Sequence, residues 1–251
     1  MLFRSSSRKE WNAPVDLGLA LPRVALIHAA GLTGVELAEA RLHDVRIIWS
    51  PQSNLDLYGD TTRVPAALRL GMTVALGPDW TPSGSMSPLE EMKCAKQLSD
   101  KRWGGLLTDE MLVRMVTVEA AKAMGAEKFI GTLAPGLFAD VAVFAGDRNQ
   151  PLAAVVKARA ETVRMVMVGG RALYGDADLV GAITPPSCET LPVCGAEKVL
   201  CVKDGDVDKG DQSLAALKDA LTQVLQSAQA ADSPPRSEEH TSELQSHHDL
   251  V

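Results

Sequence analysis

The fold prediction depends on one stretch of the chain, Gly71-Met72-Thr73-Val74-Ala75-Leu76-Gly77-Pro78-Asp79-Trp80. Residues 73–76 are apolar or β-branched and uncharged, which is typical of a strand buried on both faces. Gly77 and Pro78 end this strand, and the carboxylate of Asp79 follows. An Asp at such a place either caps a turn or belongs to an active site, because α/β barrels keep their chemistry at the carboxyl ends of their strands.

Two apolar runs upstream end in polar side chains in the same way. His28 ends the first run, and Ser53 and Asn54 follow the second. The segments between the runs are long enough for crossover helices, so the order predicts β-α-β-α-β with parallel strands. The carboxyl ends of parallel strands share one edge, and we therefore expect His28, Asn54 and Asp79 on one rim. The imidazole and the carboxylate should lie about 3–6 Å apart, within reach of one metal ion.

The motifs at these strand ends resemble those of a known superfamily when they are taken in order. They are Ile27-His28-Ala29, Ser50-Pro51-Gln52-Ser53-Asn54-Leu55, Leu76-Gly77-Pro78-Asp79 and the run 130–143. The set resembles the metal-dependent amidohydrolase superfamily, in particular the branch with chlorohydrolases and guanine, cytosine and S-adenosylhomocysteine deaminases. The resemblance covers roughly residues 20–175. Its specificity lies in the order of the motifs, since each motif alone is weak.

The resemblance implies an α/β fold, with the last three strands of a TIM-like (β/α)8 barrel and part of a small β-sandwich domain. We therefore expect an irregular start (1–22), a partial barrel (23–130), a partial small β domain (131–180), an extension with an amphipathic helix (181–233) and a tail (234–251). A barrel of this kind takes about 250 residues, and no counterpart of the family's His-x-His pair precedes His28. We expect a fragment that is inactive by itself. Residues 236–246 resemble a translated sequencing adapter, so we exclude the tail from functional reasoning.

The resemblance also implies a metal-dependent hydrolase that acts on carbon–nitrogen, non-peptide bonds. The expected reaction is deaminase- or chlorohydrolase-like, on a small nitrogen heterocycle. Asp79 matches the family's metal ligand and proton acceptor, and His28 matches the histidine beside the metal and the water. Ser53, Asn54 and Trp80 are candidates for substrate contacts, with turn capping as an equal alternative for Asn54. One divalent metal is expected, zinc first and iron or manganese as alternatives, with its remaining ligands outside this chain.

A second hypothesis belongs to a different functional class. In it, the chain is a non-enzymatic α/β module that binds a ligand or partner at the same rim. His28 and Asp79 would then be dispensable caps rather than catalytic and metal-binding groups.

The composition restricts the choice of partners. The 251 residues are 46% apolar and 23% charged, which is ordinary for a globular protein. A net charge of −7 argues against nucleic acid, and no apolar run reaches the length of a membrane span. We expect a small-molecule substrate, and a homo-oligomer stays open.

A cytoplasmic location is favoured, although an exported parent is an alternative. An exported parent would allow a disulfide among Cys188, Cys194 and Cys201, with free thiols as an equal alternative.

Local signals predict several further elements. Thr33 should cap a helix that runs to residue 42, and 55–62 should form a loop. Ser87 and Glu90 have the spacing of a capping box, and Gly169-Gly170 is a hairpin signal. The apolar face of the helix after Thr33 should comprise Val35, Leu37, Ala38 and Leu42.

Overall fold

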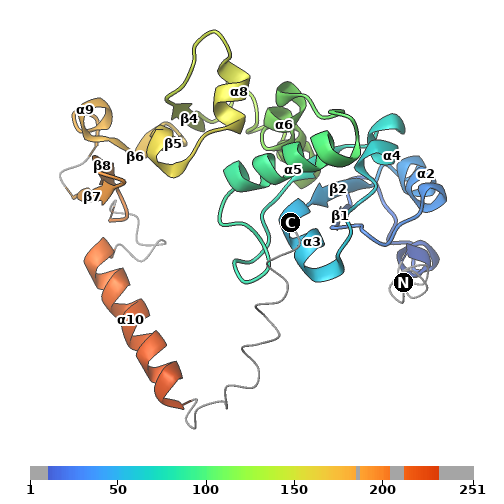
Figure 1. The fold of residues 1–251 in the computed structure, drawn as a ribbon, viewed down its shortest axis with the longest axis horizontal. Coiled ribbons are helices and arrows are strands. Elements are labelled where there is room, and N and C mark those ends of the chain that lie inside the picture. The colour runs from blue at the N-terminus through green and yellow to red at the C-terminus, as the bar shows by residue number, and fades with distance from the viewer. Residues whose placement is uncertain (1–10, 185–186, 204–211, 232–251) are drawn as a thin grey trace. The chain divides into compact units, whose positions relative to one another are not determined.

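The computed structural model describes residues 11–184, 187–203 and 212–231 (Figure 1). Its contacts divide the chain into two compact units. The first unit comprises residues 1–184 and 190–199, and the second comprises 185–189 and 200–251. The predicted tail, 234–251, lies outside the described residues.

The first unit contains a three-stranded parallel sheet. Its strands lie in the order β1 (Ala25–Ile27), β2 (Arg46–Trp49) and β3 (Val74–Leu76). The crossovers are α2 (Gly34–Leu42) between β1 and β2, and α3 (Pro51–Tyr58) and α4 (Val64–Arg69) between β2 and β3. The predicted β-α-β-α-β order is confirmed, and the carboxyl ends of the three strands share one edge.

The core of this unit forms around β2 and β3. All three residues of β3 are buried, and Ile47 and Trp49 of β2 are fully buried. The helices that follow in the chain are α5 (Pro88–Arg102), α6 (Asp109–Met115) and α7 (Val118–Met124). All three pack against β3, and α7 also packs against β2. The sheet is therefore covered by helices, as parallel sheets require.

Helix α2 begins at a complete capping box. The Thr33 hydroxyl accepts from the Glu36 amide, and the Glu36 carboxylate accepts from the Thr33 amide. The predicted apolar face was partly wrong, because Val35 and Leu42 are 78% and 86% exposed. Leu37 is buried as predicted, and the other buried residue is Ala40. At 100° per residue Val35 and Leu42 lie on the opposite side of the helix from this pair.

Two other local predictions were also wrong. The predicted loop at 55–62 begins as helix, because α3 continues to Tyr58 and ends at Gly59, whose φ of 63° suits a left-handed cap. The capping box before α5 does not form. The Ser87 side chain makes no capping bond, and the Glu90 carboxylate accepts from the Met86 amide at 2.8 Å.

A second sheet has five strands in the order β4-β5-β6-β8-β7. They are β4 (Val141–Phe144), β5 (Val163–Val168), β6 (Arg171–Asp176), β7 (Glu189–Val193) and β8 (Ala196–Leu200). The hairpin between β5 and β6 forms as predicted, with positive φ at Gly169 and Gly170. Neither β7 nor β8 was predicted from the sequence. Pro192 interrupts the strand pattern of β7, and an edge strand tolerates its missing N–H.

The remaining helices are short, except for the last. They are α8 (Pro151–Val156), the 3-10 helix Ala160–Thr162, α9 (Ala177–Val180) and α10 (Leu214–Ala231). In the second unit, Cys188 and Cys201 form a disulfide, which decides between the two alternatives for these cysteines. Cys194 is a free, exposed thiol. The amide of Leu214 at the start of α10 donates to the Glu189 carboxylate at 2.6 Å.

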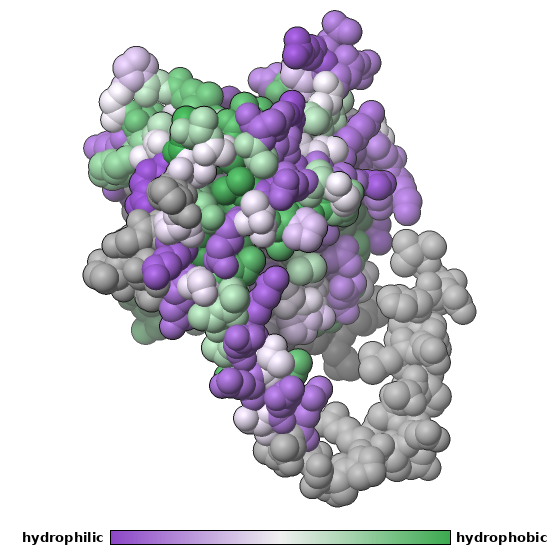
Figure 2. All heavy atoms as spheres, turned by 90° about the vertical axis from the view of Figure 1, so that its left-hand side faces the viewer, coloured by the Kyte–Doolittle hydropathy of each residue, from purple (hydrophilic) through white to green (hydrophobic). Residues whose placement is uncertain are grey.

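Apolar side chains are intermixed with polar ones on the face shown in Figure 2. On α10, Leu221, Val224 and Leu225 are 58–70% exposed. Across the described ranges, no helix has both the length and the apolar character that crossing a membrane requires.

Candidate functional site

His28 follows β1 directly, in a backbone conformation that few residues adopt. Its φ is 66°, and that of Ala29 is 51°. Such left-handed residues cost about 1–3 kcal/mol each and persist only where their surroundings hold them. Here the His28 amide donates to the Ile48 carbonyl at 2.9 Å, and the Thr62 hydroxyl donates to the His28 carbonyl. Both backbone groups of His28 are therefore held by neighbouring segments.

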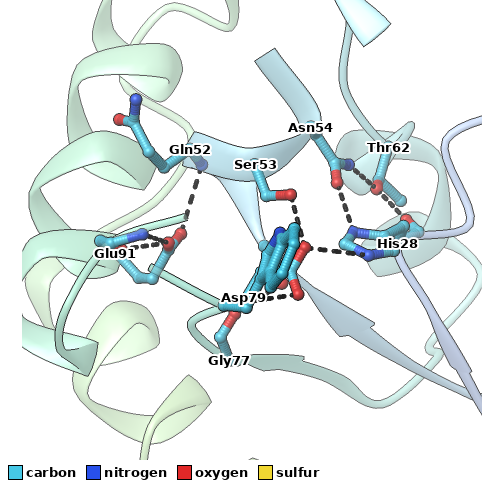
Figure 3. A network of polar contacts seen from close by, with 11 residues as sticks. His28, Gln52, Ser53, Asn54, Thr62, Gly77, Asp79 and Glu91 are labelled. Carbon is cyan, nitrogen blue, oxygen red and sulfur yellow. Dashed lines mark hydrogen bonds and ion pairs between the residues drawn. The ribbon is translucent and has the colours of Figure 1, made fainter. Parts of the chain in front are cut away.

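A chain of hydrogen bonds determines which ring nitrogen of His28 carries the proton (Figure 3). The Thr62 hydroxyl donates to a carbonyl, so it accepts from the Asn54 amide nitrogen, 2.9 Å away. The Asn54 oxygen then faces His28 Nδ1 at 2.8 Å. Because this oxygen can only accept, Nδ1 must be the N–H. In the neutral ring, Nε2 therefore holds the lone pair.

Asp79 lies just beyond β3, opposite His28. Its Oδ2 accepts from the Ser53 hydroxyl at 2.6 Å, and its Oδ1 accepts from the Trp80 amide at 2.8 Å. The Ser53 hydroxyl, followed by the Trp80 amide, lowers the pKa of the Asp79 carboxyl below its ordinary value, against a smaller opposing effect of burial. Asp79 is thus an anion at neutral pH. His28 Nε2 lies 3.5 Å from Asp79 Oδ2, within the range expected from the sequence.

Helix α3 supplies two adjacent side chains that reach opposite groups of the site. Ser53 binds Asp79, and Asn54 binds His28. Both side chains are fully buried. The structure therefore brings together four of the five predicted site residues. The fifth, Trp80, contributes its backbone amide, while its side chain is 67% exposed.

Two polar residues of this region were missed in the sequence. Thr62 is 1% exposed and connects Asn54 to the His28 carbonyl. No local signal distinguishes it from its neighbour Thr61. Glu91 is fully buried and lies on the side of Ser53 and Asp79 away from His28. Its signal was available, because Glu91 lies on the same helical stripe as the buried residues Ala95 and Leu98.

The His28–Asp79 pair offers the donor atoms that a divalent cation requires. With Nδ1 protonated, Nε2 and Oδ2 both present lone pairs, and a hydrogen bond between two acceptors is impossible. A cation or a proton between them would satisfy both. Imidazole nitrogen and carboxylate oxygen are ordinary zinc ligands, and catalytic zinc sites use three protein ligands. Among the described residues, no cluster of three or more His, Cys, Asp or Glu side chains could hold a metal.

Comparisons with known proteins place these residues in a wider context. The model of a family described as "Amidohydrolase family" matches residues 12–174. A 5'-deoxyadenosine deaminase from Methanothermobacter thermautotrophicus is 28% identical over 187 residues, 69% of this chain and 43% of that protein. An S-triazine hydrolase from Gordonia rubripertincta is 28% identical over 193 residues, 72% of this chain and 40% of that protein. The chain thus spans about two fifths of the length of these relatives.

A solved structure is similar in fold. The adenosine deaminase from Xanthomonas campestris with bound zinc superposes with a TM-score of 0.57 and 23% sequence identity. The match covers 62% of this chain and 38% of that one. At this identity the likeness concerns the fold alone.

Proposed function

The chain belongs to the amidohydrolase family, and we propose that it carries one part of the active site of a metal-dependent hydrolase. The proposed reaction breaks a carbon–nitrogen bond, or a carbon–chlorine bond, of a small nitrogen heterocycle. The observation that carries the proposal is the His28–Asp79 pair, whose two lone pairs face each other at 3.5 Å. The relatives support the substrate class, since their names refer to a deoxyadenosine and an s-triazine.

The proposed metal is one divalent cation, zinc first and iron or manganese as alternatives, because all three bind nitrogen and oxygen ligands. Asp79 Oδ2 and His28 Nε2 would hold it together with ligands outside the described residues. The cation would supply Lewis-acid activation of a water molecule, lowering the pKa of that water to about 7.

The chain's own residues have distinct proposed roles around this cation. Asp79 is kept ionised by Ser53 and the Trp80 amide, so its carboxylate is ready to accept a proton. His28 presents its single Nε2 lone pair either to the cation or to the water molecule beside it, and Asn54 keeps the ring in this tautomer. The exposed indole of Trp80 lies next to Asp79 in the chain and could stack on a flat heterocycle.

The contacts of Asp79 also bear on the rival hypothesis of a non-enzymatic module. A carboxylate that only capped a turn would need no more than the Trp80 amide. Asp79 also takes a hydroxyl from a separate helix and faces an imidazole from a separate strand. This convergence of three segments on one carboxylate supports a reactive group over a cap.

The proposal is tested in a chimera, because the chain spans about two fifths of its relatives. Residues 12–174 replace the matching segment of the deoxyadenosine deaminase. Metal content and turnover are measured on a panel of amino- and chloro-heterocycles. We expect Asp79→Asn to lower turnover by about 10²–10⁴, the usual cost of losing a general base, and to lower metal content as well. His28→Ala should lower turnover more than metal content if it orients water, and both if it is a ligand.

The matched control is Asp56→Asn, a neutralised carboxylate on the exposed face of α3. It should change neither metal content nor turnover. Full turnover in Asp79→Asn with the metal retained would contradict the mechanism. A folded, zinc-loaded chimera that turned over no compound of the panel would favour the binding module.

A further inference from the structure

Glu91 is a fully buried carboxylate that the proposed reaction does not use. It lies in the first turns of α5, on the side of Asp79 that faces away from His28 (Figure 3). Burial raises the pKa of Glu91, although hydrogen bonds from Ser85 and Gln52 oppose this effect. A buried carboxyl group is costly unless it is hydrogen-bonded. Its partners therefore indicate what the group is for.

The two oxygens of Glu91 bind two separate segments of the chain. Oε1 accepts from the Ser85 hydroxyl and, at 3.4 Å, from the Ser85 amide. Oε2 accepts from the backbone amide of Gln52 at 3.3 Å. Glu91 thereby connects the loop after β3 with the first turn of α3.

In each of these segments, the residue beside the one that binds Glu91 contacts Asp79. Gln52 precedes Ser53, whose hydroxyl binds Asp79 Oδ2. Ser85 follows Gly84, and the loop folds back so that Gly84 lies directly against Asp79. A Cβ at Gly84 would lie 2.9 Å from Asp79 Cβ and 3.0 Å from two of its backbone atoms. Glycine is therefore required there, and Asp79 is held between Gly84 and Ser53.

We propose that Glu91 is a positioning residue that ties the 80–85 loop to α3 and so fixes the Asp79 carboxylate between Gly84 and Ser53. The inference rests on the proposed function only in that Asp79 is the group being positioned. Glu91 touches no reacting atom and acts through Ser53 and Gly84.

The chemistry of the contacts explains why a carboxylate is needed. A hydroxyl and two amides converge on Glu91, and both amides can only donate. Glutamine has nearly the same shape but offers only one oxygen. Its amide nitrogen can donate to the Ser85 hydroxyl but cannot accept from a backbone N–H, so one of the two backbone amides loses its acceptor. Glu91→Gln is therefore a test that keeps the packing and changes the connection.

The first measurement is amide hydrogen exchange, by NMR, on the full 251-residue chain. Its reporters are the amides of Trp80, which binds Asp79 Oδ1, and Gly84, which binds the Trp80 carbonyl at 2.8 Å. Neither amide touches Glu91. We expect Glu91→Gln to accelerate exchange at both by tenfold or more, while the amide of Ile47 in β2 stays unchanged.

The matched control is Glu90→Gln, one residue away on the exposed side of α5. The Glu90 carboxylate accepts a hydrogen bond from the Met86 amide. Its replacement should therefore accelerate exchange at the Met86 amide and leave exchange at Trp80 and Gly84 unchanged. Unchanged exchange at Trp80 and Gly84 in Glu91→Gln would overturn the proposal. Uniform acceleration that included Ile47 would also overturn it, because it would show a general packing role. Glu91→Ala, which removes both connections, should give a larger effect at the same two amides.

A second measurement separates this inference from the proposed function. In the chimera, Glu91→Gln should lower kcat by tenfold or more and leave KM within about threefold, because Asp79 is misplaced while the rest of the pocket is intact. If the unsubstituted chimera has no activity but exchange changes at Trp80 and Gly84, the proposed function fails and the positioning role stands. If the chimera is active and Glu91→Gln changes neither kcat nor exchange, the positioning role fails alone.

Discussion

Asp79 at the rim of the parallel sheet and Asp176 at the end of β6 both have a lowered pKa, for different physical reasons. Asp176 binds the ammonium of Lys198, the main cause of its shift, and the guanidinium of Arg164 at 2.5 Å. Asp79 is held mainly by neutral donors, the Ser53 hydroxyl and the Trp80 amide. The charge of Asp176 is compensated by two cations. The charge of Asp79 is stabilised without being neutralised, and it remains available to a cation.

The surroundings of the two carboxylates agree with this difference. The Lys198 side chain is 1% exposed, and its Nζ also donates to the Val163 carbonyl of β5 at 2.9 Å. It thus links three strands of the small sheet, since Lys198 lies on β8 and Asp176 on β6. Asp79 faces His28, and both side chains are partly exposed, His28 by 22% and Asp79 by 28%. Asp176 therefore has a structural role, because each of its oxygens binds a cation, whereas Asp79 faces an imidazole instead.

The largest effect that separates the two sites is expected from Asp176→Asn. It leaves the buried Lys198 ammonium without its carboxylate, which costs about 3–5 kcal/mol in comparable pairs. The partial exposure of Asp176 places the expected loss at the lower end of this range. Hydrogen exchange of β5 and β6 amides should accelerate accordingly, while β2 is unaffected. Asp79→Asn should cost less than about 1 kcal/mol, and equal losses for the two would remove the distinction.

The stability that Asp176 contributes should depend on pH. The folded-state pKa of Asp176 lies below its ordinary value of 3.8, so the unfolded chain binds more protons between these two values. The stabilisation by Asp176 is therefore complete above the ordinary pKa and is lost as the pH falls through the folded-state pKa. The stability gap between the wild type and Asp176→Asn should be constant near neutral pH and close below about pH 3.8. A gap that persisted at low pH would show that charge is not its cause.

A smaller effect is expected from Ser53→Ala, which removes the main cause of the lowered pKa of Asp79. The Asp79 pKa should rise, as followed by the carboxylate carbon shift in an NMR titration. Loss of one hydrogen bond should cost about 1 kcal/mol of stability near neutral pH. Ser50→Ala is the control, because Ser50 binds the Gly77 carbonyl and not Asp79. An unchanged Asp79 titration in Ser53→Ala would contradict the neutral-donor account.

The smallest change in folding stability is expected at the edge of the parallel sheet. Ile27 of β1 is 63% exposed, and β1 is one of the two outer strands of the parallel sheet. Such an apolar edge favours pairing between chains. Ile27→Lys should change stability by less than about 0.5 kcal/mol and lower self-association in light scattering. Val35→Lys, at a still more exposed position on α2, should not lower self-association. Equal association in both variants would exclude the edge as the cause.

Short-range patterns were sufficient to predict the main elements. Apolar runs that stop at polar residues gave the three parallel strands, and Gly169-Gly170 gave the hairpin between β5 and β6. The failures have different causes: the end of α3 and the Glu90–Met86 contact are local, whereas the buried side of α2 depends on its packing partners. Helix α2 packs against α4, which bears on its buried side, and β7 pairs with β8 at an edge of the small sheet. Propensity alone describes neither case, because packing overrides it.

The site shows the same division between sequence and tertiary structure. By itself the sequence determined that His28, Asn54 and Asp79 follow neighbouring parallel strands, because strand ends and chain order are local properties. Only the tertiary structure decided the hydrogen-bond partners. They are Ser53 for Asp79, Thr62 for Asn54, and the backbone amides of Gln52 and Ser85 for Glu91. In the sequence, Asp79 and Asp176 are simply two carboxylates after apolar runs. Their different chemistry comes from donors that lie 26 and 22 residues away, whose directions are set only when the chain folds.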